Sequence, residues 1–269
     1  MNQVVRTSLV ALMTIAQSFN LALASEPGPA PEPGGQSLPA VDGINGKLIF
    51  GRAVDGTDSY AIGGAVTLPI GDAFGLQIDA DAGQLDGVTL GNIPVYLGAA
   101  HLFWRNPSKG LVGFYGDYAY VDLAGGLKFY TAAVEGGLYL DRFTVDGLVG
   151  VRDGDLIEIG FYDRIRLLYY PLDDLNIHVG HSYAFENHSL LYGAEWAFGS
   201  KSGAAASLFV AGALGEGGGS ATLAGLKFYL GHSDKSLIKR HREDDPPASS
   251  ETIQLTYQSL RLHQRPGQW

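Results

Sequence analysis

The sequence predicts an all-β protein, an antiparallel up-and-down β-barrel that spans a membrane with about twelve strands. Segments of about ten residues alternate between apolar and polar side chains, which is typical of barrel strands. No window reaches the ~18 uninterrupted apolar residues of a spanning helix. Charged residues make up only 17% of the chain, against roughly 25% in soluble proteins, while aromatics reach 11% and Gly occurs 38 times. These features together favour a membrane wall built from strands.

The stretch SATLAGLKFYLG, residues 220–231, is expected to be the last strand of this wall. Successive side chains of a strand point to opposite faces, so Leu226, Phe228 and Leu230 share an apolar face, and Lys227 and Tyr229 lie opposite. The spacing of Gly225, Phe228 and Leu230 looks like the closing signal on the last strand of bacterial outer-membrane barrels. We therefore expect these three residues to be read by the barrel-assembly machinery.

The same alternation recurs upstream. In the segment Phe74 to Gly83, Phe74, Leu76 and Ile78 face one way, and Gln77 and Asp79 face the other. We expect the apolar face to meet lipid and the polar face to meet the interior. The predicted strands are Gly46–Ala53, Tyr60–Leu68, Phe74–Gln84, Pro94–Trp104, Leu111–Val121, Leu127–Leu140, Phe143–Arg152, Ile157–Tyr169, Leu175–Phe185, Ser189–Phe198, Ala204–Leu214 and Ala221–Leu230.

Residues 1–24 have the parts of a secretory signal peptide: basic Arg6, a short apolar run, and small residues at Ala22 and Ala24 before Ser25. The chain contains no Cys, so neither a lipidated cysteine nor a disulfide framework is available. Residues 25–42 are rich in Pro and Gly and are expected to form a disordered linker. We therefore expect export to the outer membrane, with the barrel over residues 43–231.

Residues 232–269 are expected to form a polar C-terminal tail. Its bases precede its acids, and a solvated tail is the simplest interpretation, with contact to the cell wall through the basic half as an alternative. The net charge of −10 argues against a nucleic-acid partner, because nucleic-acid recognition begins with a basic face. The expected partner is the lipid bilayer.

Three motifs carry a resemblance to a known family: AAHLFWRNPSKGLVGFYGDY, YYPLDDLNIHVGHSYAF and GLKFYLGHSDKSLIKRHREDDPP. They are similar to a family of secreted alphaproteobacterial proteins of outer-membrane barrel type. The similarity covers about Pro39 to Pro247, and DKSLIKRHREDDP is its most distinctive part. The resemblance implies a barrel and brings no established activity or site residues with it.

Charges of both signs occupy the polar faces of the predicted strands, so they are candidates to pair across a narrow lumen or to line a small pore. Arg164 and Arg166 share one face of one strand and are the strongest candidates for pore selectivity. The full set of lumen candidates is Asp79, Asp81, Asp117, Glu135, Asp146, Glu158, Arg164, Arg166, Glu195 and Lys227.

The predicted function is therefore structural or porin-like, with a narrow charged lumen. One alternative is a lipid-modifying barrel enzyme, since His178, His181, Ser182 and His188 lie close together in the sequence. A second alternative is a soluble periplasmic β-barrel or sandwich that binds a ligand. Seven histidines without Cys partners or close spacing give no metal pattern, and no cofactor is expected.

Overall fold

The structure is a computed structural model that describes residues 38–87, 91–123, 125–155, 157–198, 205–216, 218–231, 235–244 and 246. The predicted signal peptide and most of the predicted linker lie outside the described residues, as does the chain after residue 246.

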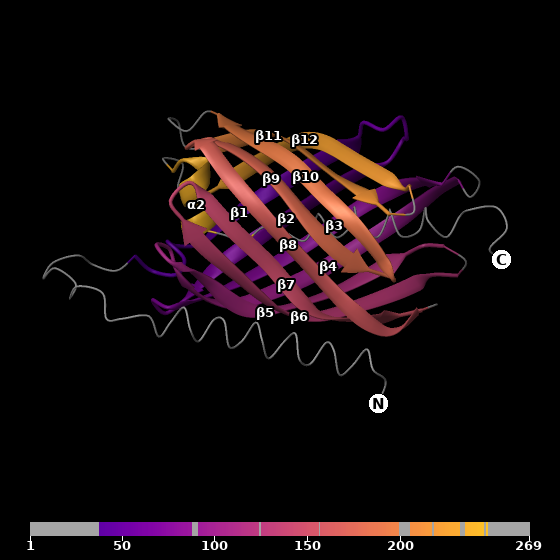
Figure 1. Cartoon of the computed structure of the whole chain (residues 1–269), viewed down its shortest axis with the longest axis horizontal. Coiled ribbons are helices and arrows are strands. Elements are labelled where there is room, and N and C mark those ends of the chain that lie inside the picture. The colour runs from indigo at the N-terminus through magenta and orange to yellow at the C-terminus, as the bar shows by residue number, and fades with distance from the viewer. Residues whose placement is uncertain are drawn as a thin grey trace, which may run out of the picture. The chain divides into compact units, whose positions relative to one another are not determined.

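Twelve strands form one closed antiparallel barrel in which each strand pairs with its neighbours in sequence, and β1 pairs with β12 (Figure 1). The predicted fold class is confirmed. The strands are β1 (Asn45–Ala53), β2 (Tyr60–Ile70), β3 (Phe74–Gly87), β4 (Gly91–Asn106), β5 (Gly110–Val121), β6 (Leu127–Leu140), β7 (Phe143–Gly154), β8 (Ile157–Leu172), β9 (Leu175–Ala184), β10 (Asn187–Phe198), β11 (Ala205–Gly215) and β12 (Ser220–Leu230).

The barrel is closed by β12, as the sequence predicts. The pairing with β1 runs from Gly46 opposite Leu230 to Ala53 opposite Leu223. The strands approach closely at Gly225, where any Cβ atom would collide with the carbonyl oxygen of Phe50. Phe228 and Leu230 point outward, 37% and 51% exposed. The recognition of these residues by an assembly machine stays a prediction.

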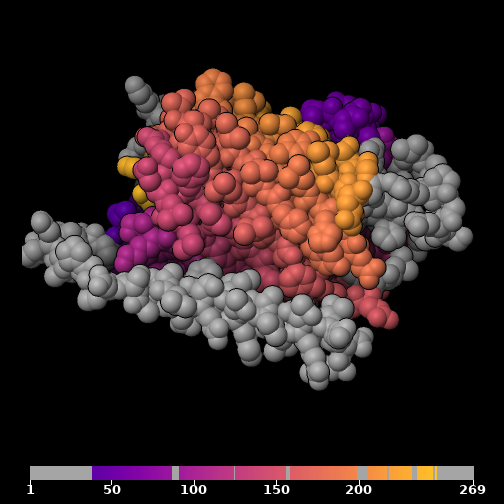
Figure 2. All heavy atoms as spheres, in the orientation of Figure 1, coloured from indigo at the N-terminus to yellow at the C-terminus, as the bar shows by residue number. Residues whose placement is uncertain are grey.

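The outer face of the wall is apolar. On β3, the side chains of Phe74 and Ile78 are 47% and 48% exposed. Gln77 and Asp79, which lie on either side of Ile78 in the sequence, are buried. Figure 2 shows one side of this wall, with side chains of neighbouring strands lying against one another. The apolar outward positions of β3 run from Phe74 to Ala82, about 26 Å along the strand and about 20 Å in height at the usual tilt. A water-exposed surface rarely carries so continuous an apolar face.

Aromatic side chains divide between the two faces. Outward pairs lie near the strand ends, such as Phe143 and Tyr169, whose ring centroids are 4.8 Å apart, and Tyr118 and Tyr130, at 5.2 Å. Four other aromatics are buried and point inward. They are Phe103, Tyr139, Tyr170 and Tyr229.

Short turns connect the strands at both ends of the barrel. The β9–β10 hairpin turns on Phe185 and Glu186, which have φ values of 53° and 58°, and the β6–β7 hairpin turns with Asp141 at φ 45°. We call the end that carries the β6–β7 and β8–β9 turns the terminal rim, because β1 begins and β12 ends there. The opposite end is the far rim.

One short helix, α2 (Leu237–Glu243), follows the barrel and lies at the terminal rim (Figure 1). Within the described residues, no helix is both long and apolar enough to cross a membrane.

We expect Ile78→Arg to destabilise the barrel in lipid by about 2–4 kcal/mol, because Ile78 lies midway along an outward apolar band. The control is Val54→Arg, at a 60% exposed position beyond the end of β1, which should change stability by less than about 0.5 kcal/mol. Urea unfolding in lipid vesicles gives both values. Equal small effects would show that this face meets water.

Candidate functional site

The interior of the barrel has a filled side and a hollow side. On β3 to β8 most inward side chains are buried, and an apolar cluster that includes Leu85, Val121 and Tyr162 fills the part toward the far rim. On the other strands many inward residues are small. The inward residues of β1, β2, β11 and β12 that remain partly exposed include Gly51, Ala53, Ala61, Gly63, Ala211 and Leu223. Side-chain size therefore decides where the lumen is open.

A hydrogen-bonded network crosses the filled side at His101. Its Nδ1 lies 2.8 Å from Glu135 Oε2, and its Nε2 lies 3.3 Å from Asp79 Oδ2. Gln77 donates to Asp79 at 2.8 Å and accepts from Thr67 at 3.1 Å. The side chains of His101 and Asp79 are 2% and 0% exposed, so these two groups pack the interior, whereas Glu135 also lines a cavity.

A second buried network joins β5, β6 and β7. Arg152 donates to Thr131 Oγ1 at 2.8 Å and to Asp117 Oδ2 at 3.3 Å, and its guanidinium lies 4.4 Å from the centroid of the Tyr162 ring. Tyr115 donates to the same Asp117 oxygen at 2.8 Å. Ionic and aromatic partners together compensate for the loss of hydration.

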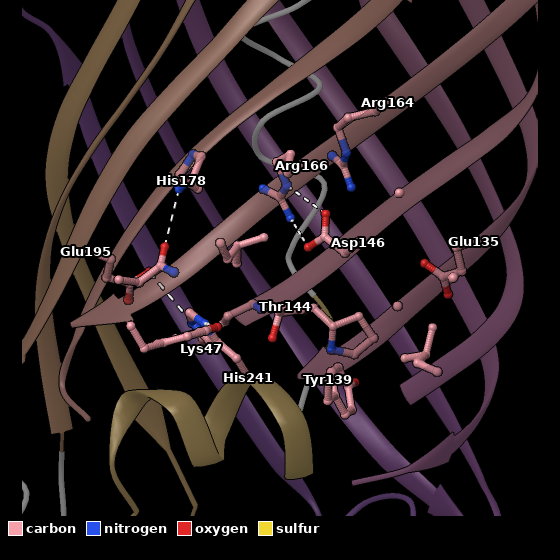
Figure 3. A pocket seen from close by; sticks show the side chains of 18 of the residues that line it. Lys47, Glu135, Tyr139, Thr144, Asp146, Arg164, Arg166, His178, Glu195 and His241 are labelled. Carbon is pink, nitrogen blue, oxygen red and sulfur yellow. Dashed lines mark hydrogen bonds and ion pairs between the residues drawn. The ribbon is translucent and has the colours of Figure 1, made fainter. Parts of the chain in front are cut away.

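A cavity of about 80 Å³ lies in the terminal half of the lumen. Arg164 and Arg166 of β8 point into it side by side (Figure 3). Arg166 makes a bidentate pair with Asp146, at 2.9 and 2.7 Å. The charged lining contains the bases Lys47, Arg164, Arg166 and Lys227 and the acids Glu135, Asp146 and Glu195.

Glu195 is the centre of a cluster at the edge of this cavity. Its carboxylate accepts hydrogen bonds from Lys227 and Ser207, both at 2.6 Å, and from the hydroxyl of Tyr229. His241 of α2 approaches it at 3.8 Å, from the helix shown below it in Figure 3. The cluster therefore links three strands of the wall to the helix.

A second cavity, of about 40 Å³, lies on the hollow side and is lined by Gly51, Ala61 and Leu223 among others. It shares His178, Glu195 and Lys227 with the first cavity, so the two adjoin. Each can hold water, which needs about 10–15 Å³, and both are far below the roughly 300 Å³ of a small-molecule pocket. The geometry suits water and small ions.

The segment that contains α2 packs into the terminal rim. We call this segment, residues 235–244 and 246, the plug. Leu237 is fully buried and Arg240 is 2% exposed. The Ile238 amide donates to the Asp173 carbonyl at 3.0 Å, and Lys47 of β1 donates to the Pro246 carbonyl at 2.8 Å. The expectation of a solvated tail is therefore wrong for this part, because the barrel wall supplies partners for its polar groups.

The four inward aromatics contact arginine side chains at this rim. Arg240 lies 5.1 Å from the centroid of the Tyr229 ring, and Arg242 lies 5.3 and 5.8 Å from those of Tyr139 and Tyr170. Arg242 also donates to the carbonyls of Asp141 and Phe143, at 2.9 and 2.8 Å. Arg105 of β4 sits 4.9 Å from the Phe103 centroid and donates to the carbonyls of Ala40 and Asp244.

Lys235 clamps both ends of the described chain together. Its Nζ lies 2.5 Å from Asp244, 3.1 Å from Asp42 and 3.3 Å from Glu243. Burial lowers the pKa of Lys235, but the hydrogen bond and charge of Asp244, with Asp42 and Glu243, raise it above the usual 10.5. Ala40 and Val41 are also buried here. The end of the predicted linker is thus ordered against the barrel, because its backbone and Asp42 find partners there.

Most predicted lumen residues lie inside the barrel, and Asp79, Asp81, Asp117, Glu135, Arg164, Arg166 and Glu195 are buried. Asp146 and Lys227 are partly exposed around the cavities, and Glu158 is exposed near the start of β8. The pattern alone misses Lys47, His101 and Arg105, which are also inward. The alternation of side chains along each strand could have identified these three residues. His101, for example, shares its face of the strand with Ala99 and Phe103.

The histidines near the β9–β10 hairpin divide between the two faces of the wall. The side chain of Ser182 is buried on the inner face, whereas His181 and His188 lie on the outer face, 2.9 Å apart, with Asp163 3.1 Å from His181. His178 points inward, 3.3 Å from Asn176. Across the part of the chain that the structure describes, no group of three or more His, Cys, Asp or Glu residues is arranged to hold a metal.

Comparison with known proteins finds similar folds only. No family model and no curated protein matches the chain. Among solved structures, the KdgM porin is 11% identical over 70% of this chain and 99% of its own, with a TM-score of 0.48. The Salmonella typhi outer membrane phospholipase dimer with bound calcium is 10% identical over 75% and 94%, also at 0.48. The translocator domain of the autotransporter NalP from Neisseria meningitidis is 12% identical over 82% and 97%, at 0.42.

These neighbours are outer-membrane barrels, as the family resemblance of the sequence leads one to expect, and they say nothing of an alphaproteobacterial origin. At such identities and TM-scores they transfer no residue roles to this chain. The assignment of the site rests on its own geometry.

We expect Asp146→Ala to destabilise the barrel by about 3–5 kcal/mol, because it leaves Arg166, whose side chain is 2% exposed, without its bidentate carboxylate. Asp58→Ala breaks the exposed pair with Arg52, whose side chains are 79% and 73% exposed, and should cost at most about 1 kcal/mol. Urea unfolding measures both. Similar small losses would mean that the Asp146 pair is hydrated.

The Lys235 clamp has a defined pH window. Because the pKa of Lys235 is raised in the folded chain, its contribution is complete below the unfolded value of 10.5 and is lost as the pH rises through the folded value. We expect the difference in unfolding free energy between wild type and Lys235→Met to stay constant from pH 7 to about 9.5 and to shrink above about 10.5. A difference that already disappears near pH 8 would contradict the clamp.

Proposed function

We propose that this protein is an outer-membrane β-barrel of porin-like type, with a narrow charged conduit for small ions through its lumen. One observation carries the proposal: two cavities adjoin inside the barrel. The larger lies against Arg164 and Arg166 of β8, the smaller lies on the hollow side, and the two share His178, Glu195 and Lys227. An interior filled by side chains would not contain such a pair of cavities.

The membrane location rests on the two faces of the wall. Exposed apolar side chains such as Ile78, Phe114 and Leu190 cover the outside, and buried charges lie within. In lipid every backbone polar group needs a partner inside the protein, and a closed barrel provides one for each strand. A soluble β-barrel or sandwich binder has the opposite requirement, a polar exterior around an apolar cavity.

The number of strands fits a narrow conduit. About eight strands leave an interior that side chains fill, whereas 16–18 strands leave an aqueous channel. Twelve strands lie between these limits, so the size of the inward side chains decides whether the interior is filled or open. Here bulky residues close one side and small residues leave the other accessible.

The lining of the larger cavity favours anions. Lys47, Arg164, Arg166 and Lys227 line it together with Glu135, Asp146 and Glu195, so bases outnumber acids among these charged side chains. Rings of basic side chains are the usual means of selecting anions in pores. Arg164 and Arg166 remain the residues that we assign to selectivity.

The proposal predicts a small anion-preferring conductance in planar bilayers under a KCl gradient. Arg164→Gln should shift the reversal potential toward that of K⁺, Arg164→Lys should restore it, and Arg52→Gln, at an exposed rim position, should leave it unchanged. Heat-modifiable gel mobility verifies that each variant is folded.

Bulk on the hollow side gives an independent test. Ala61→Phe narrows the second cavity and should abolish the current, whereas Ala80→Phe adds the same bulk on the outward face and should not. If the folded wild type and its folded variants carry no current, the conduit is refuted and the barrel is structural. Lipid hydrolysis lost on His178→Ala would instead indicate an enzyme.

A further inference from the structure

The conduit ends at the plug. The larger cavity is lined by Pro246 and His241 of the plug as well as by the wall, so the plug forms its floor at the terminal rim. Leu237 and Arg240 are buried in the same rim. Toward the far rim, by contrast, the hollow side is lined by partly exposed small residues such as Ala53 and Ala61.

The contacts of the plug are of a kind that can be broken without unfolding the wall. The strands of the barrel pair with one another through their own backbones, including β12 with β1, and the plug supplies none of these pairings. It is held by three side-chain contacts, Arg242 on the β6–β7 turn, Arg240 on Tyr229 and Lys235 on Asp42, and by single backbone hydrogen bonds from Ile238 to Asp173 and from Asp42 to Glu243. Release of these groups leaves a complete barrel.

The wall beneath the plug carries cationic side chains that would lie at the mouth of the conduit if the plug were absent. Lys47 and Arg105 use their cationic groups to bind plug carbonyls, at 2.8 Å in both cases. Lys47 lines the larger cavity together with Arg164 and Arg166, so without the plug carbonyl its charge faces the mouth of the conduit, and Arg105 lies at the same rim. The mouth therefore gains positive charge when it opens, which agrees with the anion preference proposed above.

We infer that residues 235–244 and 246 are a removable plug that closes the anion conduit at the terminal rim, so that conduction is set by the docking of this segment. This inference rests on the proposed function, and it assigns that function a closed and an open state. Arg242 is the principal latch, because it binds two wall carbonyls and two aromatic rings at once.

The test measures single-channel currents of the full chain in planar bilayers. Arg242→Gln should raise the open fraction about tenfold or more over wild type, since loss of a charge-assisted contact of about 1.4 kcal/mol changes an equilibrium tenfold. Lys239→Gln is the matched control, because it removes the same charge from an exposed position of the same helix and should leave the open fraction unchanged.

A covalent lock makes the test independent of folding defects. The chain has no Cys, so Asp173→Cys with Ile238→Cys, at residues joined by a 3.0 Å backbone hydrogen bond, introduces one defined pair. In the Arg242→Gln background, oxidation should abolish the current and reduction should restore it, while each single Cys variant should not respond. Gel mobility confirms a closed barrel throughout.

The outcomes separate the two proposals. If wild type and Arg242→Gln conduct equally and the oxidised lock still conducts, the plug inference is wrong and the conduit stands. If no variant conducts in either redox state although all are folded, the conduit itself is wrong and the inference falls with it. A current that follows the lock supports both.

Discussion

The structure depends on one constraint, the pairing of β12 with β1. Every strand in this wall finds backbone partners on both sides only if the last strand meets the first, and the register from Gly46–Leu230 to Ala53–Leu223 provides that closure. An open edge in lipid leaves backbone groups without partners, at a cost of several kcal/mol each. Once the wall is closed, alternation assigns each side chain to lipid or to the lumen.

Closure creates a second requirement, because charges placed inside need partners. Asp79 and Glu135 share His101, Asp117 pairs with Arg152, and Asp146 pairs with Arg166. Asp117 and Arg152 lie among bulky neighbours that exclude water, whereas Glu135, Asp146 and Arg166 line the larger cavity. The side lined by Gly and Ala carries fewer such pairs, and the smaller cavity lies there.

The plug joins the interior to the ends of the chain. Arginine suits this role because its planar guanidinium can donate to carbonyls while it lies over an aromatic ring. Arg242 does both, between the β6–β7 turn and the rings of Tyr139 and Tyr170. Lys235 adds a point charge that three carboxylates surround. The terminal rim is thus a binding site that the chain fills for itself.

The sequence by itself determined the strands and their two faces. Period-two alternation is local, so the position of β6, Leu127–Leu140, and the inward direction of Asp146 and Glu195 could be predicted without a structure. What only the tertiary structure decided is which inward residues meet. The pairing of Glu195 with Lys227, the burial of Tyr170 against His241 and the docking of Arg242 join residues far apart in the chain. From its sequence, the polar segment after β12 is expected to be solvated, and only the closed barrel shows that the wall provides partners for its polar groups.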